Sequence, residues 1–137
     1  GGDSDIMFIA GEAYELGLDG IPVRPWQAVE WFKKSAQLGY LPAQQRLAFM
    51  NASGEKIKKD PVEAYAWYSV IAARPDVTDK QRANASQGRN FAWGLLQPDQ
   101  LAAARKKAGT YAQKAEVVSP QQVCAADDPS CGIATQP

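Results

Sequence analysis

The sequence predicts an all-α fold of six helices arranged in three antiparallel pairs. Two observations support this prediction. An apolar stripe with helical spacing occurs twice, 36 residues apart. No stretch long enough to form a β-strand shows the alternation of apolar and polar residues that is typical of strands. The 137 residues are 45% apolar and 22% charged, which is enough to bury a core and excludes disorder throughout the chain.

The repeat is clearest in the second helix of each predicted hairpin. Its first copy comprises Ala28, Trp31, Phe32, Ser35 and Ala36, which recur as Ala64, Trp67, Tyr68, Ile71 and Ala72. Upstream of these helices, Gly11, Tyr14 and Gly17 match Ala48, Asn51 and Gly54 at an offset of 37 residues. The offset changes from 37 to 36 residues in the loop that connects the two helices of each hairpin. A period that survives a change in loop length indicates two copies of one helix–turn–helix unit.

The first repeat is expected over about residues 6–42. Its first helix runs from about 6 to 16 and ends at Gly17, because glycine readily ends a helix. The second helix starts at Pro25, a residue favoured in the first helical turn, and ends before Gly39. Residues 1–5 are expected to be a linker that includes a cloning remnant, Gly1-Gly2.

The second repeat is expected over about residues 43–77. One helix covers about 43–52, and the next begins after Asp60, which is a good N-cap residue when proline follows it. The remaining helices are expected over 78–96 and 98–115, which together form the capping pair 78–115. The tail, residues 116–137, lacks helical periodicity and is expected to be irregular.

Composition argues against several function classes. The chain has no histidine, which excludes a Ser-His-Asp or Cys-His nucleophile system and a His-ligated metal within it. A net charge of zero argues against a nucleic-acid partner. No apolar run approaches the roughly 20 residues that span a bilayer, so no direct membrane insertion is expected. We therefore predict a protein that is not an enzyme and holds no cofactor or metal.

Residues 47–73, LAFMNASGEKIKKDPVEAYAWYSVIAA, resemble one unit of the Sel1-like repeat (SLR) family. That family combines an L-G-x-x-Y segment, a glycine loop, an acidic N-cap and A-x-x-W-Y-x-x-A-A. The first copy departs where Arg24 replaces the capping acid, and the second departs at Asn51, where an aromatic residue is usual. The resemblance covers about residues 6–115 and is strongest over 10–73.

The resemblance implies a short right-handed α-α superhelix related to tetratricopeptide arrays, with two repeats plus a C-terminal capping helix pair over about residues 78–115. It also implies an adaptor function. Members of the family act as adaptors in signalling and in assembling membrane-associated complexes, so the expected partner is a peptide or protein bound on the concave face. We expect a monomer or weak oligomer. Two alternatives remain: a regulatory or targeting module of a larger cell-envelope enzyme, and a self-associating structural module.

The first helix of each pair lines the concave face in tetratricopeptide-like arrays, which defines the candidate partner-binding residues. They are Phe8, Glu12, Gln45, Phe49, Arg82, Arg89 and Trp93. Exposed aromatic and arginine side chains are typical interface anchors. Alternatively, Phe8 and Phe49 cover a neighbouring helix or the tail. The expected structural core includes Tyr14, Trp31, Trp67 and Tyr68.

Cys124 and Cys131 flank a segment of turn-forming residues in the tail, CAADDPSC. They lack the paired spacing of a zinc site, and we expect a disulfide that closes a small loop. A disulfide requires an oxidising compartment, and bacterial members of the SLR family are frequently exported. The expected location is therefore the periplasm or the cell exterior, and the alternative is two free thiols in a reducing cytoplasm.

Titration of the purified native protein with a thiol reagent in the absence of reductant tests the disulfide between Cys124 and Cys131. We expect no reactive thiol until a reductant is added, because both sulfur atoms are already bonded. Reaction of both thiols in the native protein would contradict the disulfide and favour the cytoplasmic alternative.

Overall fold

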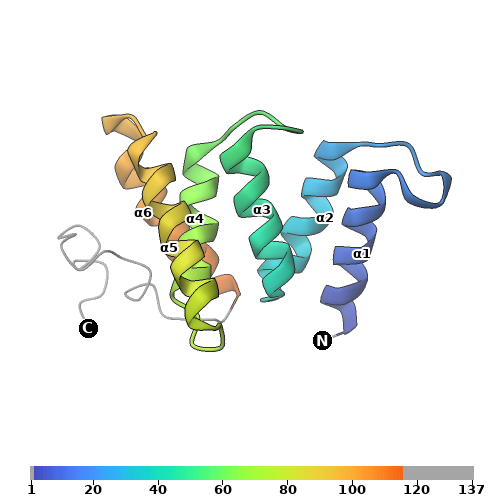
Figure 1. Cartoon of the computed structure of the whole chain (residues 1–137), viewed down its shortest axis with the longest axis horizontal. Coiled ribbons are helices and arrows are strands. Elements are labelled where there is room, and N and C mark those ends of the chain that lie inside the picture. Colours follow the sequence, from blue (N-terminus) through green and yellow to red (C-terminus); the bar gives the residue numbers. More distant parts are fainter. Residues whose placement is uncertain (1, 116–137) are drawn as a thin grey trace.

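The computed structural model describes residues 2–115, which are helical throughout apart from their connections (Figure 1). The elements are α1 (Gly2–Leu16), η1 (Leu18–Gly20), α2 (Pro25–Gln37), α3 (Leu41–Ser53), α4 (Pro61–Ala72), α5 (Asp79–Gly94), η2 (Pro98–Gln100) and α6 (Leu101–Lys114). No strand occurs in this part of the chain. The prediction of an all-α fold is confirmed.

The helices stack in chain order to form a solenoid. Figure 1 shows α1 and α2 at one end, α3 in the middle, and α4, α5 and α6 at the other end. Helix α2 packs on both α1 and α3, and α4 packs on α3, α5 and α6. Both C-terminal helices therefore rest on α4, which is the most extensively covered helix of the described chain.

The N-terminal residues differ from the expected linker. Helix α1 begins at Gly2, and Asp3 and Asp5 lie in its first turn, where carboxylates interact favourably with the helix dipole. Ser4 is buried, and its backbone carbonyl accepts a hydrogen bond of 2.8 Å from the Ser35 hydroxyl on α2. The expectation of a linker over residues 1–5 is therefore corrected: residues 2–5 are the first turn of the first hairpin.

The two repeats close their loops with the same backbone hydrogen bond. The Arg24 N–H donates to the Tyr14 carbonyl at 2.8 Å, and the Asp60 N–H donates to the Asn51 carbonyl at 2.9 Å. The first loop contains the extra turn η1, which accommodates its different length. Asp60 also caps α4, since its side chain accepts from the backbone N–H groups of Val62 and Glu63.

The two aligned tryptophans have different environments. Trp67 on α4 is completely buried and stacks on Tyr111 of α6, with 4.4 Å between ring centroids. Trp31 on α2 is only half-buried, and the Lys34 amine of the same helix lies 4.7 Å from its ring centroid. The difference arises because α6 provides an aromatic partner for Trp67. Tyr14 and Tyr68 are partly buried against the core.

A buried carboxylate also attaches α6 to α4. Glu63 on α4 accepts hydrogen bonds from the Tyr111 hydroxyl at 2.7 and 2.9 Å, and the Lys107 amine of α6 lies 3.4 Å from it. Lys33 of α2 lies 3.7 Å from the same oxygen that Lys107 approaches. The Tyr111 ring and hydroxyl therefore fix the position of the last helix against the second repeat.

Two further expectations concern the disulfide in the tail and the absence of membrane insertion. Residues 116–137, including Cys124 and Cys131, lie outside the described residues, so the disulfide stays a prediction. Among the described helices, none combines the length and the hydrophobicity that crossing a membrane requires.

Replacing Trp67 with alanine tests the packing between α4 and α6. We expect Trp67→Ala to lower the free energy of unfolding by about 3–5 kcal/mol, because a fully buried indole leaves a large cavity. Urea denaturation followed by circular dichroism measures the loss. Trp31→Ala is the matched control, and we expect less than about half of that loss from a half-buried ring. Equal losses in the two variants would contradict the packing described here.

Candidate protein-interaction groove

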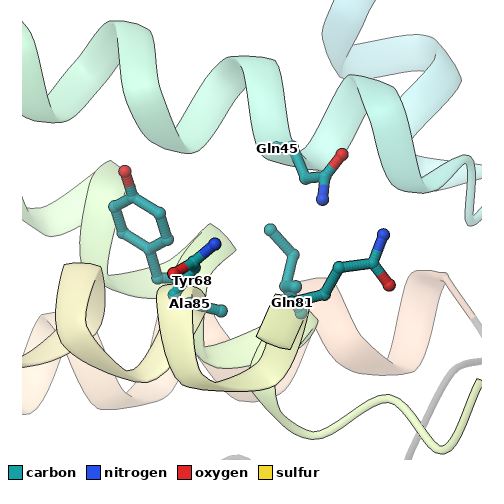
Figure 2. Close-up of a pocket in the computed structure, with 6 residues that line it drawn as sticks. Gln45, Tyr68, Gln81 and Ala85 are labelled. Atoms are coloured by element: carbon teal, nitrogen blue, oxygen red, sulfur yellow. The ribbon is translucent and has the colours of Figure 1, made fainter. Parts of the chain in front are cut away.

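A hollow of about 220 Å³ lies between α3, α4 and α5 (Figure 2). We call it the α3–α5 groove, and its lining residues are Gln45, Tyr68, Ile71, Gln81, Asn84 and Ala85. Gln45 points from α3 into the hollow, and the Tyr68 and Gln81 side chains lie on its two sides. The groove therefore joins the second repeat to the first of the C-terminal helices.

The close approach of α5 to α4 depends on a glycine inside a helix. A Cβ atom at Gly88 would lie 2.6 Å from the Cζ atom of Tyr68, which is closer than van der Waals contact allows. The absence of a side chain at Gly88 lets the Tyr68 ring lie against the α5 backbone. This packing places the ring in the wall of the groove instead of wholly within the core.

The Tyr68 hydroxyl is available to a ligand. Burial raises the pKa of this phenol, so it stays protonated at neutral pH and can donate a hydrogen bond. Within residues 2–115 the hydroxyl has no hydrogen-bond partner. The hydroxyl can therefore donate a hydrogen bond to an acceptor that binds in the groove.

The other polar groups in the groove are carboxamides, from Gln45, Gln81 and Asn84. The Gln81 carbonyl oxygen accepts from the Thr78 backbone N–H at 2.9 Å, which holds the side chain at the start of α5. None of the six lining residues is ionisable to a charged form at neutral pH. The groove therefore has polar donors and acceptors but carries no formal charge.

An aromatic and a cation lie on α3 beside the groove. Phe49 is one helical turn after Gln45 and its side chain is 46% exposed. The Arg46 guanidinium carbon is 5.9 Å from the Phe49 ring centroid. Glu12 of α1 is close enough to contribute to the electrostatic stabilisation of the Arg46 cation. Gln45, Phe49 and Glu12 thus extend from the groove along α3 to α1.

Arg46 is held by a buried carboxylate from the first repeat. Glu15 of α1 is 3% exposed; it accepts hydrogen bonds from Arg46, at 2.9 Å to Nε, and from Lys56, at 3.1 Å. Burial alone would raise the pKa of Glu15, but the hydrogen bonds from Arg46 and Lys56, together with their positive charges, keep that pKa below its usual value. This cluster fixes the orientation of α3 relative to α1.

Two of the predicted partner-binding residues, Phe8 and Arg82, make their contacts outside the groove. Phe8 packs against Phe32 and Tyr40, with centroid distances of 5.3 and 5.4 Å, as the alternative interpretation expected for it. Arg82 donates to the carbonyl of Ala72 at 2.7 Å and so caps α4. Its side chain is directed to the end of α4 and away from the groove lining.

Trp93 lies at the far end of α5. It packs against Tyr65 of α4, and the Arg105 guanidinium of α6 lies 4.7 Å from its ring centroid. Arg89 is half-buried on α5 and is not part of the groove lining. Of the seven predicted residues, Gln45 alone lines the groove.

Sequence reasoning missed most of the groove lining. The apolar stripe predicts Tyr68 to be part of the core, and no pattern in the sequence indicates a role for Gln81 or Asn84 in the groove. One signal was present: Gly88 lies on the apolar stripe of its helix, where a glycine indicates close approach by another group. The sequence does not reveal that the approaching group is Tyr68.

Comparison with known proteins identifies the family. Residues 5–40 and 41–76 each match the family model described as Sel1 repeat, and together these matches cover more than half of the chain. The chain belongs to the Sel1 repeat family. The first match contains α1 from its second turn and α2, and the second contains α3 and α4. Sel1 repeat proteins are generally protein-interaction scaffolds and are typically not enzymes.

A solved structure shares the fold of this Sel1 repeat chain. It is the crystal structure of a protective antigen present in uropathogenic Escherichia coli strains, described as displaying an SLR fold. The two chains are 25% identical with a TM-score of 0.70, over 93% of this chain and 26% of the antigen. The chain therefore spans about a quarter of the antigen's length. A search of curated proteins found no match.

The contact between Gly88 and Tyr68 can be tested by adding one methyl group. We expect Gly88→Ala to lower the free energy of unfolding by about 1–3 kcal/mol, because the new Cβ overlaps the Tyr68 ring. Gly94→Ala is the matched control on the same helix. A Cβ at Gly94 has no neighbour within 4 Å, so alanine there is expected to be neutral or stabilising by up to about 1 kcal/mol. A stabilising effect of Gly88→Ala in urea denaturation would contradict the close approach.

Proposed function

We propose that this chain is a non-enzymatic adaptor that binds a peptide or protein segment in the α3–α5 groove. The single observation that carries the proposal is the hydroxyl of the half-buried Tyr68, which has no partner within residues 2–115 and belongs to a residue that lines a hollow with three carboxamides. The chain belongs to a family whose members are generally protein-interaction scaffolds, and this membership also supports an adaptor function.

The groove chemistry favours a neutral stretch of polypeptide. Carboxamide side chains both donate and accept hydrogen bonds, which matches the N–H and C=O groups of a peptide bond. Ile71, Ala85 and the Tyr68 ring provide an apolar surface for one side chain of the ligand. Since the lining is uncharged, a phosphate or carboxylate ligand would lose its hydration without gaining an ion pair.

Residues beside the groove can extend the contact along α3. Phe49 is exposed, and Arg46 is positioned by its hydrogen bonds to Glu15. An aromatic ring and an arginine side by side are typical of the residues that contribute most to binding. The second part of the ligand is therefore expected to lie over Phe49, towards the Glu12 side of α1.

The cellular compartment is a separate proposal. We infer that the chain acts in the periplasm or outside the cell, and the spacing of Cys124 and Cys131 supports this. The thiol titration described above tests it.

Filling the groove tests the adaptor proposal. Peptides from a displayed random library are selected on the wild-type chain, and the dissociation constants of synthetic copies are measured by calorimetry. We expect Asn84→Trp to weaken binding at least about tenfold, because an indole on this exposed position occupies the hollow.

Asn90→Trp is the matched control, because Asn90 is exposed on the same helix and does not line the groove. It should leave binding unchanged. Tyr68→Phe, which removes only the hydroxyl, should weaken binding by several fold. Selected peptides that bind all three variants as tightly as the wild type would refute the groove.

A further inference from the structure

Helix α1 exposes an apolar stripe that the groove does not use. The stripe comprises Ile6, Ile9, Ala13 and Leu16, which share one helix face by their spacing. The side chains of Ile6, Ile9 and Leu16 are 66%, 61% and 52% exposed. Contiguous exposed apolar residues on one face of a helix indicate an interaction surface.

The face of α3 that corresponds to this stripe in the second repeat is covered by other helices, and its contacts indicate how the stripe on α1 can be covered. At the offset of 37 residues, Ile9 corresponds to Arg46 of α3, which hydrogen-bonds to Glu15 of the preceding hairpin. Ile6 and Ala13 correspond to Ala43 and Met50, and both of these are buried. The corresponding face of α3 therefore contacts the hairpin before it. The stripe on α1 is shaped to receive another hairpin in the same way.

The charges at the two ends of the described solenoid are of opposite sign. Helix α1 contains four acidic residues and no lysine or arginine, and Asp3 and Asp5 are exposed. Helix α6 contains four basic residues and no acidic residue, and Lys106 and Lys114 are exposed. Two α1 helices placed together would therefore repel each other, whereas α1 and α6 attract.

The C-terminal end also exposes apolar side chains. Phe91 of α5 and Leu95, the residue that caps the C-terminal end of α5, are 58% and 37% exposed. Figure 1 shows α5 and α6 at the same end of the described solenoid, so that end carries exposed apolar residues on α5 and basic residues on α6, and its charge is opposite to that of α1. Complementarity of this kind selects partners and orientation.

We propose that the apolar stripe on α1 of one copy of this chain docks on the α5–α6 end of a second copy. The contact continues the solenoid from one molecule into the next. Because the two surfaces differ, each added copy leaves a free stripe at one end and a free α5–α6 surface at the other. Assemblies therefore grow with concentration beyond a dimer. The proposal does not depend on the α3–α5 groove, which lies elsewhere on the molecule.

Sedimentation velocity of the full chain tests the assembly. At low ionic strength we expect the weight-average mass to rise with protein concentration past that of a dimer, and to fall when salt screens the charges. Ile9→Glu should weaken the association at least about tenfold, because it places an unpaired carboxylate in the contact. Phe49→Glu, a similarly exposed apolar position outside the stripe, should leave it unchanged.

A mixing experiment identifies the pair of surfaces. The first variant, Ile9→Glu, keeps an intact α5–α6 end, and the second, Phe91→Glu with Lys106→Glu, keeps an intact stripe. We expect each variant alone to be monomeric and an equimolar mixture to form a one-to-one dimer and nothing larger. Circular dichroism establishes that both variants fold, as expected for substitutions at exposed positions.

Three results would overturn the proposal. A wild-type chain that stays monomeric at every concentration would show that something other than a second copy covers the stripe. Association that Ile9→Glu leaves intact would place the contact elsewhere. A mass that stops at a dimer, with no dimer in the mixture of variants, would indicate a symmetric contact between like surfaces.

Discussion

The fold depends on the burial of Trp67 between α4 and the last helix. A helix hairpin has too little interior to bury its own apolar face, so each repeat requires a neighbour on each side. On α4 these neighbours are α3 and the two C-terminal helices. The stack between Trp67 and Tyr111, together with the hydrogen bonds from Tyr111 to Glu63, holds α6 in place. Without α6, the largest side chain of the core would be open to solvent.

The groove is a consequence of the same packing. Helix α5 also rests on α4, and Gly88 allows it to approach until its backbone meets the Tyr68 ring. The corresponding aromatic in the first repeat, Phe32, is instead fully buried against Gly11 of α1. One repeat position therefore serves as core in the first hairpin and lines the α3–α5 groove in the second. The difference lies in which helix contacts the ring.

Ion pairs set the angle between the two repeats. Glu15 is buried, and its charge is compensated by Arg46 and Lys56 of the second repeat. A buried carboxylate without these partners would be costly, so the pairing specifies how α3 sits on α1. The same pairing holds Arg46 beside Phe49, at the margin of the groove. Here a structural contact also determines the position of a candidate binding residue.

Much of this architecture could be predicted from the sequence. The helices follow from apolar periodicity and from local end signals such as Pro25 and Asp60, because these depend on neighbours within one or two turns. The repeat follows from the recurrence of one stripe, and it indicated the hairpins and the family. The helical first turn at Gly2 was missed, because its stability depends on Ser4 being buried against α2.

The site depended on the tertiary structure. Periodicity places Phe8 and Gln45 at equivalent positions, yet Phe8 packs on its own repeat and Gln45 lines the groove. It also places Trp31 and Trp67 at equivalent positions, although α6 covers only the second with an aromatic ring. Local signals in the sequence account for most of the helices and for the apolar face of each helix. The tertiary structure decided which of those faces is covered, because burial depends on helices that are distant in the chain.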